Sequence, residues 1–208
     1  MEASPLVRHA GPIVLIAGAY LVVADVTLLL VLTMDELPAL TAHPVYRVAS
    51  VAYAAAFVGL LMALFAAYAR QAREAGRFGF VALFAATLGT FTLGADMWFE
   101  GFAVPWLIEV VPRLLDLEKT NIWVIGYFSS FVLFAVGWVL FGLASLGARV
   151  FPLTISVAIT VGGLIGFLAG APPYGAALGL ALVGLGGWLI KADRAVGTRN
   201  SPATTVAA

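Results

Sequence analysis

Two carboxylates stand four residues apart near the close of a long apolar run: Asp96 and Glu100, in the stretch 93–106. Residues at this spacing share one face of a helix. A third acid, Asp25, lies inside the first apolar run. Ionisable groups at membrane depth are costly and mostly functional, and burial disfavours the charged form of a carboxyl. We therefore predict that all three are catalytic, with Asp25 and Asp96 as acid and partner and Glu100 setting their protonation.

Polar and aromatic side chains at similar depth form the predicted substrate-binding set. Its members are Arg47, Tyr53, Trp98, Phe99, Trp123 and Tyr127. An aromatic face stabilises a nearby cation by roughly 0.5–2 kcal/mol, which suits a carbocation or an apolar ligand. Three plainer alternatives stay open. Asp25 and Arg47 would pair only to hold helices together, Glu100 would reach interfacial water, and the tryptophans would form an ordinary aromatic belt.

The composition defines the class of protein. Hydrophobic residues make up 62% of the 208 and charged residues 11%, with a mean hydropathy of +1.05. Soluble domains average about 25% charged residues, so we predict a multi-pass membrane protein whose partner is the lipid bilayer. The net charge of zero and the lack of a basic face exclude nucleic acid. Cysteine is absent, which excludes thiolate metal sites, and no metal or cofactor is expected. His9 and His43 should lie on opposite sides of the membrane, which argues against paired haem ligation within one chain.

The predicted fold class is all-α, an integral membrane bundle of six transmembrane helices with cytoplasmic N and C termini. The expected spans are 11–33, 45–69, 78–104, 121–146, 152–170 and 174–190. Gly76 is expected to close the turn after the second span. The third span should end before Pro105, because proline disfavours helical conformation at the preceding residue. The apolar part that follows, 106–115, is predicted to be an interfacial or re-entrant segment.

The orientation follows from Lys and Arg, which are retained on the cytoplasmic side. In the six-helix arrangement one side receives Arg8, Arg70, Arg73, Arg77, Arg149, Lys191, Arg194 and Arg199. The other side receives only Arg47, Arg113 and Lys119. Both termini are assigned to the richer side. The transmembrane domain would cover 1–192, with a four-helix functional part at 1–150, a glycine-rich hairpin at 151–192 and a disordered cytoplasmic tail at 193–208.

The spacing of the acids predicts that they meet. Asp25 lies eight residues before Thr33, and Asp96 lies eight before Val104. At the rise of a helix both carboxyls are then roughly 12 Å below the same ends of two helices that run in one direction. We expect Asp25 and Asp96 to face each other across a shared cavity in the outer half of the first four helices.

The last two spans are expected to serve packing. Gly162, Gly166 and Gly170 are spaced by four, as are Gly175 and Gly179. Small residues at this spacing let helices approach closely. This hairpin is therefore predicted to be a scaffold, or a face through which the chain forms a homo-oligomer.

Two stretches carry a family resemblance: 68–79, with the sequence YARQAREAGRFG, and 96–105 after it. They resemble a widespread group of small bacterial multi-pass membrane proteins, most of which have no assigned activity. The size and the buried acids are also similar to the small integral-membrane terpenoid cyclases, which protonate an epoxide or alkene with a carboxylic acid and need no metal. The resemblance covers residues 10–150 and implies a bacterial inner-membrane location.

Three functions compete at this stage. The first is an integral membrane enzyme that acts on a lipid-soluble, isoprenoid-like substrate by acid-initiated, metal-free chemistry such as terpenoid cyclisation. The second is a proton-coupled small-molecule carrier or exporter that uses the same acids as a relay. The third is an accessory structural subunit that assembles through the glycine-rich hairpin.

Overall fold

The computed structural model describes residues 5–34, 43–111, 120–169 and 171–199, and every element within them is a helix. The elements are α1 (Pro5–Arg8), α2 (Ala10–Leu32), α4 (Pro44–Val110), α5 (Asn121–Ala148), α6 (Leu153–Ile165), the short 3₁₀ helix η2 (Gly166–Leu168) and α7 (Gly175–Arg199). The all-α prediction is confirmed for this part of the chain. The starts of α2 and α5 lie within one residue of the expected spans.

Four helices are long and apolar enough to cross a membrane: α2, α4, α5 and the portion Gly175–Ala195 of α7. The segment Leu153–Leu168, made of α6 and η2, is apolar but shorter. A hydrocarbon core about 30 Å thick requires roughly 20 residues of helix. These lengths and this composition are those of a multi-pass membrane protein.

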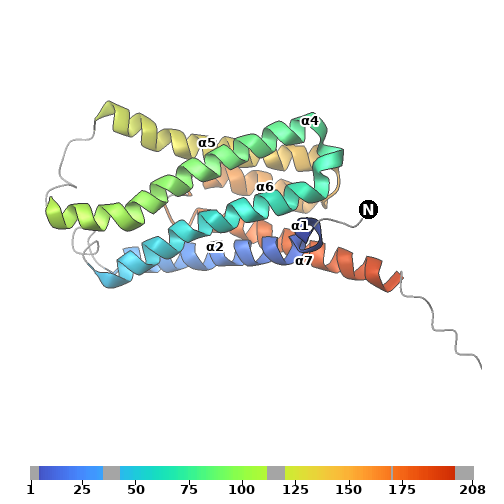
Figure 1. Ribbon diagram of the computed structural model, residues 1–208, viewed down its shortest axis with the longest axis horizontal. Helices are drawn as coiled ribbons and strands as arrows, with labels where there is room; N and C mark the ends of the chain where they lie inside the picture. Colours follow the sequence, from blue (N-terminus) through green and yellow to red (C-terminus); the bar gives the residue numbers. More distant parts are fainter. Residues whose placement is uncertain (1–4, 35–42, 112–119, 170, 200–208) are drawn as a thin grey trace, which may run out of the picture.

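Gly76 breaks α4 into two arms, 44–75 and 77–110. Its φ of 57° and ψ of −148° are non-helical, in a region of backbone conformation that is open almost only to glycine. The chain turns back at this point, so that the two arms run antiparallel (Figure 1). The predicted role of Gly76 is confirmed, although the helix continues up to the turn through the polar residues 70–75 instead of stopping at 69.

Pro105 does not end the helix, and this expectation is wrong. The second arm of α4 continues through Pro105 to Val110, with Pro105 buried. Proline is tolerated inside membrane helices because neighbouring groups satisfy the freed backbone atoms. Residues 106–110 of the predicted interfacial segment are therefore ordinary helix, and 112–115 lie outside the described residues.

The helices pack around one core (Figure 1). α2 lies against α4 and α7, while α5 lies against the second arm of α4 and α6. The largest fully buried side chains include Trp138 of α5, Tyr53 of α4 and Leu182 of α7. The core is thus assembled from all of the long helices.

Glycines of the last hairpin lie where helices of the same chain pack closely against each other. A Cβ added at Gly162 would lie 2.9 Å from Leu178 Cα, and one at Gly179 would lie 2.9 Å from the Gly18 carbonyl oxygen. Both contacts are close approaches of two helix backbones, which favours the scaffold interpretation over a free oligomer face. α7 also runs on to Arg199, so residues 193–199 are helical and the prediction of a disordered tail from 193 is wrong there.

Candidate functional site

Asp25 is the one charged residue among the described residues that is fully buried, with 0% exposure. Its Oδ2 atom accepts a hydrogen bond of 2.8 Å from the backbone N–H of Ala176 in the first turn of α7. The N-terminal N–H groups of a helix have no partners within the helix. Asp25 therefore acts as the cap of α7, supplied by a different helix.

The second oxygen of Asp25, Oδ1, faces Tyr53. A Cβ added to Gly175 would lie 3.0 Å from Tyr53 Oη and 3.1 Å from Asp25 Oδ1, so the two oxygens converge on this glycine. The Tyr53 hydroxyl donates to the carbonyl oxygen of Ala169, and Tyr53 and the backbone N–H of Gly175 also interact with the Asp25 carboxyl. Asp25 is thus held by groups of α4 and of the first turn of α7.

Asp96 is partly buried and lies against α5. The Ser130 hydroxyl, which is itself buried, lies in hydrogen-bonding contact with Asp96 Oδ2 and also donates to the Tyr127 carbonyl oxygen at 2.7 Å. Ser130 is the ninth residue after Asn121, which places it roughly 13 Å from the start of α5. Ser130 therefore lies well inside α5, where it meets Asp96 of α4.

Glu100 lies one turn beyond Asp96 and interacts with the Tyr127 hydroxyl. Tyr46, at the start of α4, lies near both side chains and interacts in turn with Ser50. The second arm of α4, its first arm and α5 each contribute to this group. We call Asp96, Glu100, Tyr127, Ser130 and Tyr46 the acid cluster; its chemistry is that of carboxyls hydrogen-bonded by hydroxyls.

Asp25 and Asp96, which were expected to face each other, are not hydrogen-bonded to each other in the structure. Asp25 is bonded to α7 and Asp96 to α5, so each carboxyl has its own partners. Glu100 acts electrostatically on Tyr53 and on Tyr127 and connects the two regions. The apolar cleft between the two arms of α4 and the pocket between α5 and α6 are both without an acid on their walls.

Arg47 does not pair with Asp25. Its Nη2 atom lies 2.5 Å from Glu109 Oε1, on the second arm of α4, and both side chains are largely exposed. The continuation of α4 past Pro105 places Glu109 opposite Arg47. The alternative that Arg47 pairs with Asp25 is therefore wrong. Arg47 instead forms an ion pair with Glu109, near the two ends of α4.

The predicted aromatic residues divide into two groups. Trp98 and Phe99 are half exposed on the surface of α4, at 51% and 52%, as in an aromatic belt. Trp123 stacks on Tyr127 with ring centroids 5.0 Å apart, and Tyr127 also contacts Phe131 at 4.9 Å. Only the second group adjoins the acid cluster.

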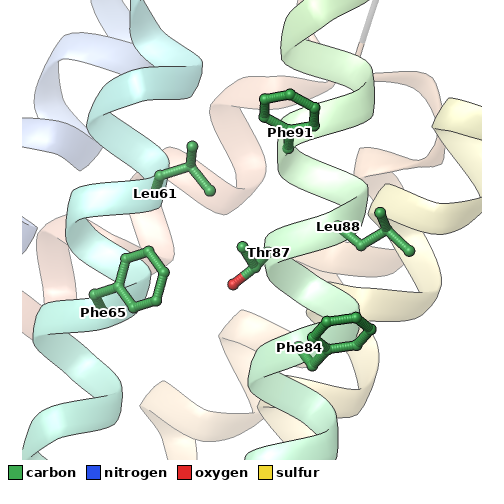
Figure 2. Close-up of a pocket in the computed structure, with 6 residues that line it drawn as sticks. All are labelled: Leu61, Phe65, Phe84, Thr87, Leu88 and Phe91. Carbon is green, nitrogen blue, oxygen red and sulfur yellow. The ribbon is translucent and has the colours of Figure 1, made fainter.

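An apolar cleft opens between the two arms of α4 (Figure 2). It has a volume of about 220 Å³ and is lined by Leu61, Phe65, Phe84, Thr87, Leu88 and Phe91. The Thr87 hydroxyl is the single polar side-chain group on its walls, and it has no hydrogen-bond partner. The cleft has the chemistry to hold a hydrocarbon chain, and no acid lies on its walls.

Sequence reasoning missed Ser130 and the turn before α7 as partners of the acids. A signal for Ser130 existed, because a hydroxyl in an apolar span at the depth of a neighbouring carboxyl is a natural hydrogen-bond partner. No such signal pointed to Ala176, whose contribution is a backbone N–H. Among the described residues, no group of three His, Cys, Asp or Glu side chains gathers as a metal site would require.

Comparisons of the chain with protein-family models, curated proteins and solved structures each found no match.

Proposed function

We propose that this chain is an integral membrane enzyme that acts on a lipid-soluble, isoprenoid-like substrate by acid-initiated, metal-free chemistry. The observation that carries the proposal is the acid cluster, where Asp96 and Glu100 lie one helical turn apart, partly exposed, and in contact with hydroxyls of α5. Carboxyls held in this way within an apolar bundle suit proton donation. Asp25, fully buried and bonded to α7, is assigned a positioning role.

The proposed chemistry conserves protons. The carboxylic acid of Asp96 or Glu100 transfers its proton to an alkene or epoxide, whose electron pair forms the new bond to hydrogen. The resulting cation closes a ring by attack of a second alkene, and loss of a proton to the carboxylate restores the acid. The faces of Tyr127 and Trp123, which stack beside the cluster, would stabilise the cation.

Targeted variants test this assignment. Asp96→Asn and Glu100→Gln remove the transferable proton with little change in shape, whereas Glu109→Gln alters an exposed acid of the same helix as a control. Lipid extracts from cells that depend on each variant should lose one lipid-soluble product with the first two and retain it with the control. Retention of every lipid-soluble product by the folded Asp96 and Glu100 variants would refute the assignment.

The membrane topology belongs to the same proposal. The break at Gly76 supports the predicted number of crossings, because it gives α4 two arms of spanning length; six crossings also require the shorter segment Leu153–Leu168 to serve as the fifth, before α7. Arg70, Arg73 and Lys191 then lie on the cytoplasmic side of a bacterial inner membrane. Single cysteines introduced at the exposed residues Glu74 and Gly147 should react only from the cytoplasmic side; labelling from outside would exclude this orientation.

A proton-coupled carrier is the alternative, and one observation favours it. Glu100 interacts electrostatically with both Asp96 and Tyr53, and Asp25 is bonded to the start of α7; interrupted helices at membrane depth occur at transporter binding sites. Proteoliposomes should then show proton flux that depends on Glu100. Flux that is independent of a pH gradient would exclude this alternative.

An accessory subunit or homo-oligomer would require a free packing face. Gly184 and Gly187 of α7 have open space where a side chain would be, and they supply the remaining small-residue surface. Cross-linking in native membranes through cysteines at these two positions would trap such an assembly, and a monomer under the same conditions would argue against it.

A further inference from the structure

A pocket of about 370 Å³ lies where α5 passes into α6. Its lining residues are Leu146, Arg149, Phe151, Leu153 and Ser156. Phe151 is buried and packs against Trp188 of α7, with ring centroids 6.0 Å apart. The pocket therefore combines apolar walls, backed by a third helix, with one cation and one hydroxyl.

The hydroxyl of Ser156 is the unusual feature of this pocket. Ser156 is 0% exposed, and its Oγ atom has no hydrogen-bond partner. Leaving a buried hydroxyl unpaired costs roughly 1–3 kcal/mol. A ligand that occupies the pocket can form a hydrogen bond with this buried hydroxyl and so remove the cost of leaving it unpaired.

The other polar groups of the pocket all favour an anion. Arg149 is exposed, and no ion pair involves it among the described residues. α6 begins at Leu153, and Pro152 supplies no side-chain cap; the N–H groups of Ile155 and Ser156 donate to the Pro152 carbonyl oxygen, which leaves those of Leu153 and Thr154 to donate to a ligand. A guanidinium, a hydroxyl and a helix N-terminus are donors that recognise phosphate.

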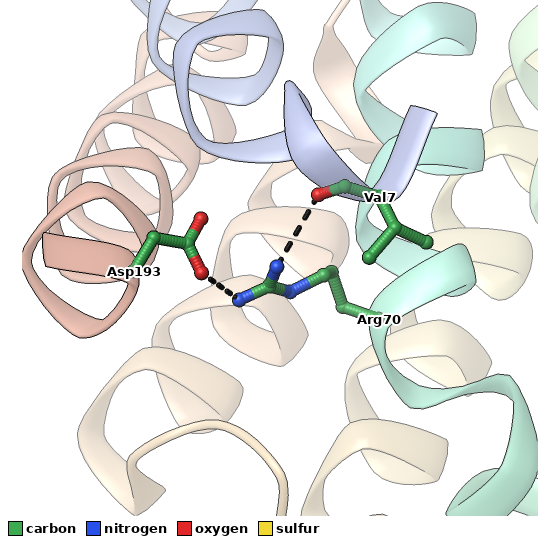
Figure 3. Close-up of polar contacts among 3 residues, drawn as sticks. All are labelled: Val7, Arg70 and Asp193. Atoms are coloured by element: carbon green, nitrogen blue, oxygen red, sulfur yellow. Dashed lines mark hydrogen bonds and ion pairs between the residues drawn. The ribbon is translucent and has the colours of Figure 1, made fainter. Parts of the chain in front are cut away.

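The pocket lies at the basic end of the bundle. Gln71 donates to Ser145 Oγ at 2.9 Å, which places the end of α5 beside the polar turn of α4. Arg70, one residue before, donates to Asp193 Oδ1 at 2.6 Å and to the Val7 carbonyl oxygen at 3.2 Å (Figure 3). The N-terminal segment, α4 and α7 thus meet at the end where Arg149 lies, the level at which lipid headgroups would be found.

We propose that this pocket binds the phosphate headgroup of an anionic phospholipid, with Arg149, Ser156 and the α6 N-terminus holding the phosphate and Leu146, Phe151 and Leu153 contacting the start of an acyl chain. The proposal does not depend on the chemistry of the acid cluster. An anionic phospholipid is present in the same bilayer as the protein, and its phosphate can form the hydrogen bond that the Ser156 hydroxyl lacks.

The test uses the full-length protein, delipidated in a neutral detergent, with thermal unfolding as the readout. Three additives separate the possible sources of binding: phosphatidylglycerol, diacylglycerol with the same acyl chains, and inorganic phosphate. Arg149→Gly removes the cation at a position whose φ of 55° suits glycine, so the fold is expected to persist. Ser156→Ala removes the unpaired hydroxyl, and Arg77→Ala is the control, an exposed charge at the same end of the bundle.

Phosphatidylglycerol should raise the Tm of the unaltered protein and of Arg77→Ala. In Arg149→Gly and Ser156→Ala the apparent dissociation constant for this lipid should rise at least about tenfold, which corresponds to about 1.4 kcal/mol. Without lipid, Ser156→Ala should be at least as stable as the unaltered protein, because no unpaired hydroxyl remains. An equal shift with diacylglycerol would overturn the phosphate assignment, and an equal shift with inorganic phosphate would overturn the lipid. Equal responses of all variants to phosphatidylglycerol would overturn the site.

Discussion

Asp25 Oδ2 accepts a hydrogen bond of 2.8 Å from the backbone N–H of Ala176, although 151 residues separate the two in the chain. On the other side of the same turn, Tyr53 donates to the Ala169 carbonyl oxygen. A side chain of α2 and one of α4 thus satisfy the backbone where η2 ends and α7 begins. Because unsatisfied backbone groups are costly in a membrane, these two contacts stabilise the turn inside the bundle.

The first prediction concerns whether Asp25 stabilises the protein as a hydrogen-bond acceptor for α7 or through a negative charge. Asp25→Asn keeps an acceptor for Ala176 and offers an N–H donor to Tyr53, so its free energy of unfolding should change by less than about 0.5 kcal/mol. Asp25→Ala leaves the Ala176 N–H unpaired and should cost about 1–3 kcal/mol. Thermal unfolding in detergent measures both. Equal, large losses in the two variants would mean that a charged Asp25 is needed.

Gly76 should be essential for its backbone conformation and not for space. Nothing lies within 4 Å of a Cβ added there, yet its φ is +57°. Gly76→Ala should therefore destabilise the protein by about 1–3 kcal/mol through strain alone. Gly147→Ala, also in open space but with helical conformation, should be neutral or slightly stabilising. Similar unfolding temperatures for the two variants would contradict this explanation of the turn.

The contact of α2 with α7 should tolerate no added atom at Gly18. A Cβ there would lie 2.6 Å from the Gly179 carbonyl oxygen and 2.8 Å from Leu182 Cβ. Gly18→Ala should cost about 1–3 kcal/mol, because the two backbones must separate. Gly184→Ala, on the open face of α7, provides the matched control and should leave the midpoint of denaturation unchanged. If both substitutions were harmless, the close packing of α2 and α7 would be incorrect.

Removal of the Arg47 side chain should have little effect. Its ion pair with Glu109 is exposed, with 41% and 57% of the two side chains accessible, and exposed pairs contribute about 0–1 kcal/mol. Arg47→Ala should unfold within a few degrees of the unaltered protein and keep its lipid-soluble product. A complete loss of product with intact folding would contradict this expectation and would support the predicted role of Arg47 in substrate binding.

Sequence pattern predicts the class and most helix positions because each depends on local chemistry. Apolar runs define the spans, and Gly76 marks its turn through a backbone preference that no other residue shares. The helix end predicted at Pro105 was wrong, because packing in a membrane helix overrides the local preference of proline. The same error hid the Arg47–Glu109 pair, which exists only because α4 continues past that proline.

The candidate site was predictable in its acids but not in their partners. Asp25, Asp96 and Glu100 stand out as acids in apolar runs, but the depth expected for Asp96 assumed a helix end at Val104, whereas α4 continues to Val110. Depth alone does not fix the rotation of a helix about its axis. Asp25 therefore turned out to face the α7 turn and Asp96 to face Ser130, contacts that depend on tertiary packing.

The most direct measurement of the central claim is lipid-extract profiling of cells in which the gene is deleted and replaced by the unaltered chain, by Asp96→Asn or by Glu100→Gln, with protein levels matched in the membrane fraction. We expect one cyclised or isomerised lipid-soluble compound to be restored only by the unaltered chain, while its acyclic precursor accumulates with both variants. Restoration of that compound by either folded variant would show that a transferable proton at the acid cluster is not what the chain contributes.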